Sequence, residues 1–395
     1  MFDLNRRALI GGLAAGVALP AYAQQRASLG FANGERPLDS GFPEKGAMIV
    51  QRTRAPLLET PFEVFDQGVF TPNDRFYVRW HYQDMPLDVD TRSFRLKIGG
   101  AVTRPLSLSL AELLKMPRIE LAAVNQCSGN SRGFVSPRVA GAQWGHGAMG
   151  NARWLGVPLR HLLDLAGVRA GALAVRFAGL DQPPPDAPAF VKSLALDHAR
   201  DGEVMIAFAM NGAPLPMLNG FPIRLVVPGW YSTYWIKALD RIEVLNGPDD
   251  NFWMTTAYKV PTEAYGSVAP GRTDFPAAPI STMTPRSFIT NVRDGARVAA
   301  GPLPLRGIAF GGASAVAAVD LSLDAGASWQ PATLGPDQGK YGFRAWSATV
   351  KLAPGAQRIA VRCTAADGQV QRFEPVWNPG GYMISTIETV AVTAA

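Results

Sequence analysis

The sequence predicts an α+β protein, in which a mixed α/β domain is followed by a β-sandwich of immunoglobulin type. Hydrophobic residues make up 47% and charged residues 18% of the 395 residues, which is apolar enough for more than one core. Five prolines gather between residues 261 and 285 and predict a linker. Helix and strand patterns alternate before this linker, whereas only short strands separated by turns follow it.

Local signals support each part. Phe94–Ile98 alternates apolar and polar residues, as a half-buried strand does, and Ile223–Val227 is typical of a buried strand. Ser109 and Glu112 form a capping box that opens a short helix. A second helix is expected to begin at Pro158 and to end at Gly167.

After the linker, strands are expected near Val319–Leu323, Ala348–Leu352 and Arg358–Cys363, each followed by a turn. The expected organisation is a leader over residues 1–23, an extended lead-in over 24–60, a mixed domain over 61–260, a linker over 261–284 and a sandwich over 285–395.

The first residues resemble an export signal. Arg6 and Arg7 precede the apolar run Ala8–Leu19, and Ala21 and Ala23 complete an A-x-A site. The run is shorter than the roughly 20 residues of a permanent membrane anchor. Paired arginines favour the twin-arginine route, which exports folded proteins; an ordinary secretory signal is the alternative. We therefore expect a periplasmic protein without a membrane span in its mature chain.

Composition excludes several functions. The net charge of +6 is diffuse, with no basic stripe for nucleic acid. The two cysteines, Cys127 and Cys363, cannot build a disulfide framework, a four-cysteine zinc site or an iron–sulfur cluster held by its own thiolates. No C-x-x-C-H motif attaches a c-type haem to this chain.

Cys127, in the stretch VNQCSGNSRG, follows an apolar strand and opens a loop of small residues. Its sulfur could therefore face a cavity, where Arg132 would favour the thiolate and make it a metal ligand. The alternative is a buried, inert cysteine. On a strand, Arg79 and His81 share one face and could bind an anion, unless that face is simply solvated.

Asn219, Arg224 and Lys237 bracket the buried strand, and Asp181 follows another strand end. Such a set suits a phosphate, although Asn and Asp also favour ordinary turns. Tyr258 could donate a hydrogen bond or pass a proton, or it could only pack. The other histidines, His146, His161 and His198, lack metal-ligand spacing and are predicted to be structural.

Together these segments resemble the sulfite oxidase family of molybdenum enzymes, and bacterial periplasmic sulfite dehydrogenases most of all. The motifs that carry the resemblance are FYVRWH, QCSGNSRG, GNARWLGVPL, AMNGAPLP followed by NGFPIRLVVPG, TYWIK and PVWNPGGYM. The resemblance begins near Phe62 and reaches the C-terminus.

The resemblance implies a molybdenum ion bound to a pterin dithiolene, with Cys127 as its protein thiolate. Arg79, Arg132 and Tyr258 would line the substrate pocket, and the sandwich would be a dimerisation domain. The residues implied to hold the cofactor are Tyr77, Val78, Arg79, Trp80, His81, Cys127, Asp181, Asn219, Arg224, Trp235, Ile236 and Lys237.

The implied reaction is the two-electron oxidation of sulfite to sulfate by oxygen-atom transfer at molybdenum. Electrons would pass one at a time to a c-type cytochrome, either a subunit or a soluble acceptor, because no haem is expected on this chain. The chain would form a homodimer or a heteromer with the cytochrome. The alternatives are a sister enzyme acting on sulfane sulfur or a sulfoxide, and a non-enzymatic exported binding module.

The sequence departs from vertebrate members at three places. Ser131 replaces the first of two adjacent arginines, and Asn219 replaces a histidine of the phosphate-gripping loop. A third pocket arginine, near the C-terminus, has no matched position here. These departures leave the charge of the pocket open.

Overall fold

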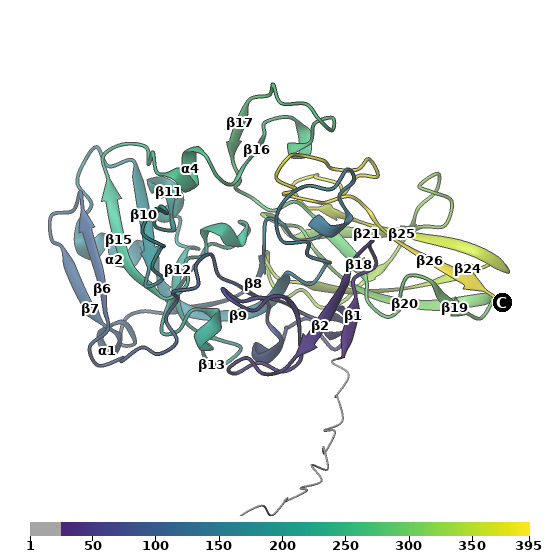
Figure 1. Cartoon of the computed structure of the whole chain (residues 1–395), viewed down its shortest axis with the longest axis horizontal. Helices are drawn as coiled ribbons and strands as arrows, with labels where there is room; N and C mark the ends of the chain where they lie inside the picture. Colours follow the sequence, from purple (N-terminus) through teal and green to yellow (C-terminus); the bar gives the residue numbers. More distant parts are fainter. Residues whose placement is uncertain (1–24) are drawn as a thin grey trace, which may run out of the picture.

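The computed structural model describes residues 25–395, which form a mixed α/β domain beside a β-sandwich (Figure 1). The predicted fold class is confirmed, with a helix-bearing domain before residue 260 and two facing sheets after residue 285. The predicted leader, residues 1–23, lies outside the described residues. No helix between residues 25 and 395 is both long and apolar enough to cross a membrane.

The segment expected to be an extended lead-in instead forms most of an antiparallel sheet. Its strands are too short for their alternation to be read from sequence, but Met48, Leu58 and Val78 are buried in a small core with Trp80. The 3₁₀ helices η1 (Phe62–Asp66) and η2 (Asn73–Arg75) follow its fourth strand. In order, the strands are β1 (Arg26–Ser28), β2 (Glu35–Asp39), β3 (Met48–Arg52), β4 (Leu57–Glu59) and β5 (Val78–Arg79).

The outer part of the first domain is a five-stranded sheet with helices packed on it, farthest from the sandwich in Figure 1. The predicted capping box is present at Ser109, and Gly167 ends the second helix at a φ of 68°. The strand order is β11 (Val191–Ala195), β10 (Ala174–Gly179), β15 (Leu239–Leu245), β6 (Arg95–Gly100) and β7 (Leu106–Ser109). The α-helices are α1 (Leu110–Leu113), α2 (Leu159–Ala166), α3 (Leu196–Ala199) and α4 (Phe252–Thr255).

A third sheet, between the outer sheet and the sandwich in Figure 1, leads to Cys127. Its strand β8 ends at Gln126, so Cys127 opens the cysteine loop (residues 127–132). The strand order is β13 (Ala213–Pro214), β12 (Met205–Met210), β9 (Met149–Pro158) and β8 (Ile119–Gln126), with β14 (Arg224–Val226) also paired to β12. The 3₁₀ helices beside it are η3 (Arg132–Phe134), η4 (Met217–Asn219) and η5 (Ser232–Tyr234).

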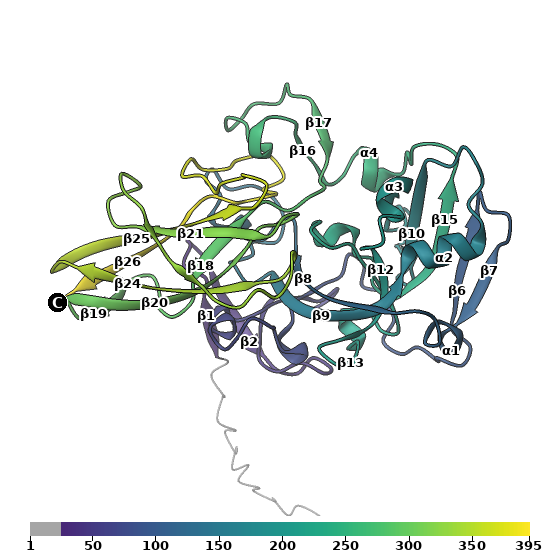
Figure 2. The same ribbon diagram turned by 180° about the vertical axis from the view of Figure 1, so that it is seen from behind.

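A short hairpin, with η6 (Ala264–Gly266) between its strands β16 (Lys259–Pro261) and β17 (Ala277–Pro279), leads into the sandwich. Figure 2 shows the sandwich sheets extending away from the first domain. One sheet has the order β18 (Arg286–Ile289), β20 (Gly301–Phe310), β24 (Arg344–Leu352) and β23 (Thr333–Leu334). The other has the order β19 (Ala296–Val298), β26 (Glu388–Ala394), β25 (Gly355–Ala365), β21 (Val316–Ser322) and β22 (Gln330–Pro331).

The two domains share one hydrophobic core. Phe65 of η1 meets Phe343 of the sandwich edge-on, with ring centroids 5.9 Å apart. The backbone also crosses the junction, because the amide of Val124 on β8 donates to the carbonyl of Tyr341 at 2.8 Å. The sandwich is therefore part of the support for the strand that ends at Cys127.

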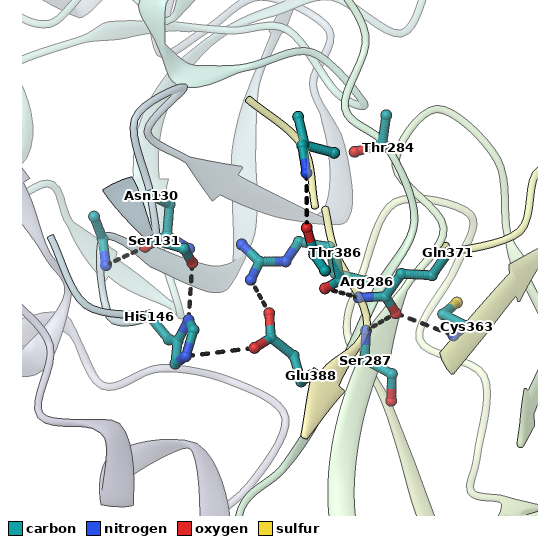
Figure 3. A network of polar contacts seen from close by, with 12 residues as sticks. Asn130, Ser131, His146, Thr284, Arg286, Ser287, Cys363, Gln371, Thr386 and Glu388 are labelled. Carbon is teal, nitrogen blue, oxygen red and sulfur yellow. Dashed lines mark hydrogen bonds and ion pairs between the residues drawn. The ribbon is translucent and has the colours of Figure 1, made fainter. Parts of the chain in front are cut away.

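A polar network joins the cysteine loop to the sandwich (Figure 3). The Ser131 hydroxyl lies 2.8 Å from Nδ1 of His146, and Nε2 of that ring lies 3.4 Å from a carboxylate oxygen of Glu388 on β26. The other oxygen of Glu388 accepts from Arg286 on β18, which is fully buried. Burial lowers the pKa of His146 to about 4, against the raising effect of Glu388, so the ring is neutral near pH 7.

This network makes stability depend on pH. The unfolded chain protonates His146 below its ordinary pKa of 6.5, whereas the folded chain resists protonation until about 4. The free energy of unfolding should therefore fall as pH drops through this window, by at most roughly 1.4 kcal/mol per pH unit from this group. Urea unfolding of His146→Gln should show a shallower dependence between these limits. His161→Gln on α2 is the control, and equal slopes for His146→Gln and the unmodified protein would contradict the prediction.

Candidate active site

Cys127 lines a cleft of about 470 Å³, a volume that includes space open to solvent. The loop around it is fixed from both sides: the Cys127 amide donates to the Ala148 carbonyl at 2.9 Å, and its carbonyl accepts from the Asn130 amide at 2.9 Å. The side-chain oxygen of Asn130 accepts from the Ala148 amide, also at 2.9 Å. The sulfur is therefore presented to the cleft by a rigid backbone.

Most of the residues predicted from sequence meet at this cleft. Those that line it are Tyr77, Val78, Arg79, His81, Cys127, Asn219, Arg224, Trp235, Lys237 and Tyr258. Those that lie behind or beside the lining are Trp80, Arg132, Asp181 and Ile236. The structure thus brings together side chains that are up to 181 positions apart in the sequence, from Tyr77 to Tyr258.

The segment around β5 supplies opposite faces to different partners. Arg79 and His81 both line the cleft, although β5 ends at Arg79 and His81 lies just beyond the strand. Trp80 points away into the core, where its indole nitrogen donates to the Leu218 carbonyl at 3.0 Å. Its ring also lies 4.5 Å from the ammonium of Lys237, so it helps to hold that cation at the cleft.

The floor of the cleft is a set of buried polar groups. Arg224 donates to the Asn219 carbonyl at 2.9 Å and to the Trp235 carbonyl at 3.3 Å. The amide of the Asn219 side chain donates to the Tyr77 carbonyl at 3.1 Å. Ile236 serves through its backbone, because its carbonyl accepts from the Leu225 amide at 2.8 Å. The two sides of the floor are thereby tied together.

The floor concentrates positive charge away from water. Burial lowers the pKa of Arg224 to about 10. Burial also lowers the pKa of Lys237, helped by the charge of Arg224 and opposed by that of Asp181. Burial raises the pKa of Asp181, with Lys237 opposing it. One carboxylate facing several cations leaves the floor in need of an anion.

Several polar atoms of the cleft have no protein partner among residues 25–395. They are Nη1 of Arg79, Nδ2 of Asn125, Oγ of Ser128, Nε of Arg224 and Oγ1 of Thr233. Buried donors in native proteins are normally satisfied, so these atoms indicate a polar ligand that the cleft is built to hold. The residues present therefore fit a large anionic cofactor, with the thiol of Cys127 as a soft metal ligand beside it.

Aromatic rings form the wall opposite the floor. The Tyr258 hydroxyl lies 2.7 Å from Nε2 of His81, and Phe190 stacks on the His81 ring with centroids 3.5 Å apart. Trp253 of α4 meets the same ring edge-on at 5.1 Å. Tyr258 is held at a φ of 55°, a strained conformation for a side chain of this size.

Arg132 does not line the cleft. Its Nε donates to the Gly380 carbonyl and one terminal nitrogen to the Ala142 carbonyl, both at 3.0 Å. Its guanidinium carbon lies 5.0 Å from the centre of the Tyr382 ring. Arg132 therefore connects the cysteine loop to a C-terminal segment, in addition to any effect of its charge on the cleft.

Sequence reasoning missed part of the wall and the floor. Ser232 directly precedes the TYWIK motif and Thr233 is its first residue, so their position was the available signal. Phe190 and Trp253 had none, because an aromatic residue outside a recognised motif is usually only packing. Tyr382 lay within the PVWNPGGYM motif, but its approach to Tyr258 depends on how the two domains meet.

Two family models cover most of the described chain. Residues 82–253 match an oxidoreductase molybdopterin binding domain, and residues 277–394 match a Mo-co oxidoreductase dimerisation domain. The cleft residues from Asn125 to Lys237 lie within the first match. This match agrees with the unsatisfied polar atoms, since a molybdopterin is a large polar anion.

Similar proteins indicate the same family. Human mitochondrial sulfite oxidase is 35% identical over 353 residues, which are 85% of this chain and 63% of that protein. Chicken sulfite oxidase is 35% identical over 347 residues, covering 82% of this chain and 73% of that protein. The chain thus spans less than two thirds of the length of its mammalian relatives.

Among solved structures, the sulfane dehydrogenase SoxCD from Paracoccus pantotrophus superposes with a TM-score of 0.74 at 26% identity. The match covers 87% of this chain and 85% of that one. The predicted resemblance is confirmed by the two family models, the curated relatives and this structure. The chain belongs to the sulfite oxidase family of molybdenum enzymes.

Proposed function

We propose that this protein is a periplasmic sulfite dehydrogenase, which oxidises sulfite to sulfate and passes the electrons to a c-type cytochrome. The observation that carries the proposal is a single cleft in which a protein thiol, Cys127, shares a buried lining with Arg79, His81 and Tyr258. When bound there, the molybdenum cofactor supplies the two-electron redox chemistry, with water as the source of the added oxygen.

The chain would hold this cofactor at the floor and at the loop. Cys127 is the thiolate suited to the metal, while Arg224 and Lys237 are the buried cations suited to a phosphate. The free nitrogen of Asn125 and the hydroxyl of Thr233 add donors that currently have no protein partner among the described residues. An anion bound there would offset the desolvation of the cations and raise their pKa values.

Arg79 would attract and orient the substrate. Sulfite carries close to two negative charges at neutral pH, and one terminal nitrogen of Arg79 is buried without a partner in the structure of residues 25–395. A charge-assisted hydrogen bond in a recessed site is stronger than one in water. The buried cations Arg224 and Lys237 would add to the attraction of the sulfite anion.

His81 and Tyr258 would handle protons. Burial, followed by the charge of Arg79, lowers the pKa of His81 well below its ordinary value, and burial raises that of Tyr258. Both groups are therefore neutral near pH 7. If Nε2 of His81 carries the proton, it donates a hydrogen bond to the phenol oxygen of Tyr258. The Tyr258 O–H then remains free to donate to an oxyanion. Sulfite and water yield sulfate, two protons and two electrons, so the pair also offers a route for a proton to leave.

The proposals for the electron acceptor and the compartment rest on the sequence. A haem protein takes electrons singly, so each sulfite would deliver its two electrons in two single-electron steps to c-type haem. The cytochrome would be either a subunit or a soluble partner. The dimerisation-domain match supports assembly as a homodimer or as a heteromer with that cytochrome. The paired arginines Arg6 and Arg7 and the A-x-A site support export in the folded state to the periplasm.

A second candidate is the oxidation of sulfane sulfur. It is favoured by the structural similarity to the sulfane dehydrogenase SoxCD, which extends over most of both chains. The cationic lining of the cleft favours sulfite instead, because sulfite carries close to two negative charges at neutral pH.

The first test uses protein purified from the periplasmic fraction of a host that makes the cofactor. We expect about one molybdenum per chain by elemental analysis, and sulfite-dependent reduction of two added cytochromes c per sulfite. Molybdenum with no sulfite activity would contradict the proposal and leave the sulfane candidate. An absence of molybdenum would contradict both.

Replacing Cys127 with serine should abolish sulfite oxidation, because an alcohol is a poor substitute for a thiolate ligand. We expect a loss of at least roughly 100-fold in kcat, measured by cytochrome c reduction. Cys363→Ser is the matched control, since Cys363 is equally free of disulfides but buried in the sandwich. The assignment of Cys127 fails if both variants keep their activity.

Tyr258→Phe keeps the ring and removes the hydroxyl. Losing one hydrogen bond to a charged substrate costs about 1.5–3 kcal/mol, so kcat/KM for sulfite should fall roughly 10- to 100-fold. Steady-state kinetics between pH 6 and 9 provide the measurement, and Tyr231→Phe, in a buried position away from the cleft lining, is the control. Unchanged kinetics over this range would rule out the role of the hydroxyl.

A further inference from the structure

Tyr382 belongs to the C-terminal family match, yet its ring stacks on Tyr258, which lines the cleft of the first domain. Its segment follows Trp377 and crosses back to the cysteine loop, where the Met383 amide donates to the Ser128 carbonyl at 2.9 Å. Ser128 directly follows the candidate metal ligand. The sandwich thus contributes a side chain and a backbone contact to the cleft region.

The position of Tyr382 is fixed by its own segment. The fully buried side chain of Asn378 accepts from the Tyr382 amide at 3.0 Å and donates to its carbonyl at 2.8 Å. The same side chain donates to the Gly266 carbonyl at 2.9 Å, which ties the segment to the hairpin between the domains. Tyr382 is therefore held by a closed turn rather than by a free loop.

Two glycines let this turn approach the first domain closely. Gly381 has a φ of 56°, and a Cβ there would lie 2.8 Å from Cγ of Arg132. A Cβ at Gly380 would lie 2.4 Å from the Tyr382 ring. The contact between this turn and Arg132 therefore requires residues without side chains.

The Tyr382 ring completes the aromatic wall. It stacks on Tyr258, with centroids 5.5 Å apart and planes 25° apart. Its other neighbour is the guanidinium of Arg132, 5.0 Å from the ring centre. That guanidinium already donates to the backbone carbonyls of Gly380 and Ala142, which fix its position. It therefore holds the Tyr382 ring in place.

The hydroxyl of Tyr382 lies within the electrostatic range of the reaction site. Burial raises its pKa, the charges of Arg132 and Arg79 oppose this effect, and Cys127 adds to it. The same three residues act on Tyr258. Tyr382 is consequently a neutral phenol near pH 7, and its hydroxyl has no hydrogen-bond partner in the protein from residue 25 onward, whereas that of Tyr258 contacts His81.

We propose that Tyr382 is a substrate-binding residue supplied by the second domain, which donates a hydrogen bond to the bound oxyanion beside Arg79. Together with Tyr258, its ring limits the cleft to small oxyanions. The proposal rests on the proposed function and deepens it. It names Tyr382 as a neutral hydrogen-bond donor to the bound oxyanion.

The test separates the hydroxyl from the ring, using molybdenum-loaded holoenzyme. Tyr382→Phe should raise the KM for sulfite about tenfold and leave kcat within about twofold, and it should weaken sulfate binding, measured by calorimetry, by the same factor. Tyr382→Ala should in addition admit a bulky anion, so that benzenesulfonate, which we expect not to compete with sulfite in the unmodified protein, becomes a competitive inhibitor.

Tyr265→Phe is the matched control. Tyr265 also packs under an arginine, with Arg372 at 4.8 Å from its ring, but its hydroxyl already donates to the Val370 carbonyl at 3.4 Å, away from the cleft lining. It should keep the KM of the unmodified protein. The proposal is overturned if Tyr382→Phe keeps both the KM and the sulfate affinity of the unmodified protein, or if it lowers kcat with no change in KM.

Sulfate binding distinguishes the two hypotheses. If the unmodified holoenzyme binds sulfate but does not oxidise sulfite, the proposed function fails, and a weaker sulfate affinity in Tyr382→Phe still supports this residue as an oxyanion donor. If the unmodified holoenzyme neither binds sulfate nor oxidises sulfite, both proposals fail.

Discussion

Positive charge buried without a sufficient counter-charge is the constraint on which the site depends. Arg224 and Lys237 are removed from water beside a single carboxylate, Asp181, and their pKa values fall as a result. Such an arrangement is costly in an isolated chain. It persists because backbone carbonyls, indole rings and the surrounding core fix the cations in place. An anionic ligand that binds the folded chain would remove much of this cost and stabilise the fold by mass action.

The parts of the fold that could be predicted are those set by local chemistry. The capping box at Ser109 and the left-handed Gly167 are determined by a few adjacent residues, and both are present. The first antiparallel sheet could not be predicted, because its strands of two to five residues gain their burial from partners elsewhere in the chain. Short strands carry too little alternation to be recognised alone.

The candidate site also combines features that local sequence encodes with features that only the tertiary fold creates. Cys127, Arg79 and Lys237 belong to motifs whose residue types indicate their chemistry, and the structure gathers them at one cleft. Phe190, just before β11, and Trp253 of α4 come together only because the fold brings both rings against His81. No spacing in the sequence encodes that convergence. The role of Arg132 could not be predicted either, since its partners are backbone carbonyls 10 and 248 positions away.

The reach of the sandwich into the cleft bears on how such enzymes diversify. A mutation between Asn378 and Met383 alters the contacts to Tyr258 and Ser128 without changing a residue of the first domain. Substrate range can therefore drift in one domain while cofactor loading stays under selection in the other. The same geometry disfavours recombination between relatives. In a chimera that joins the first domain of one relative to the sandwich of another, the residues that meet beside Tyr258 and Ser128 would come from two different proteins.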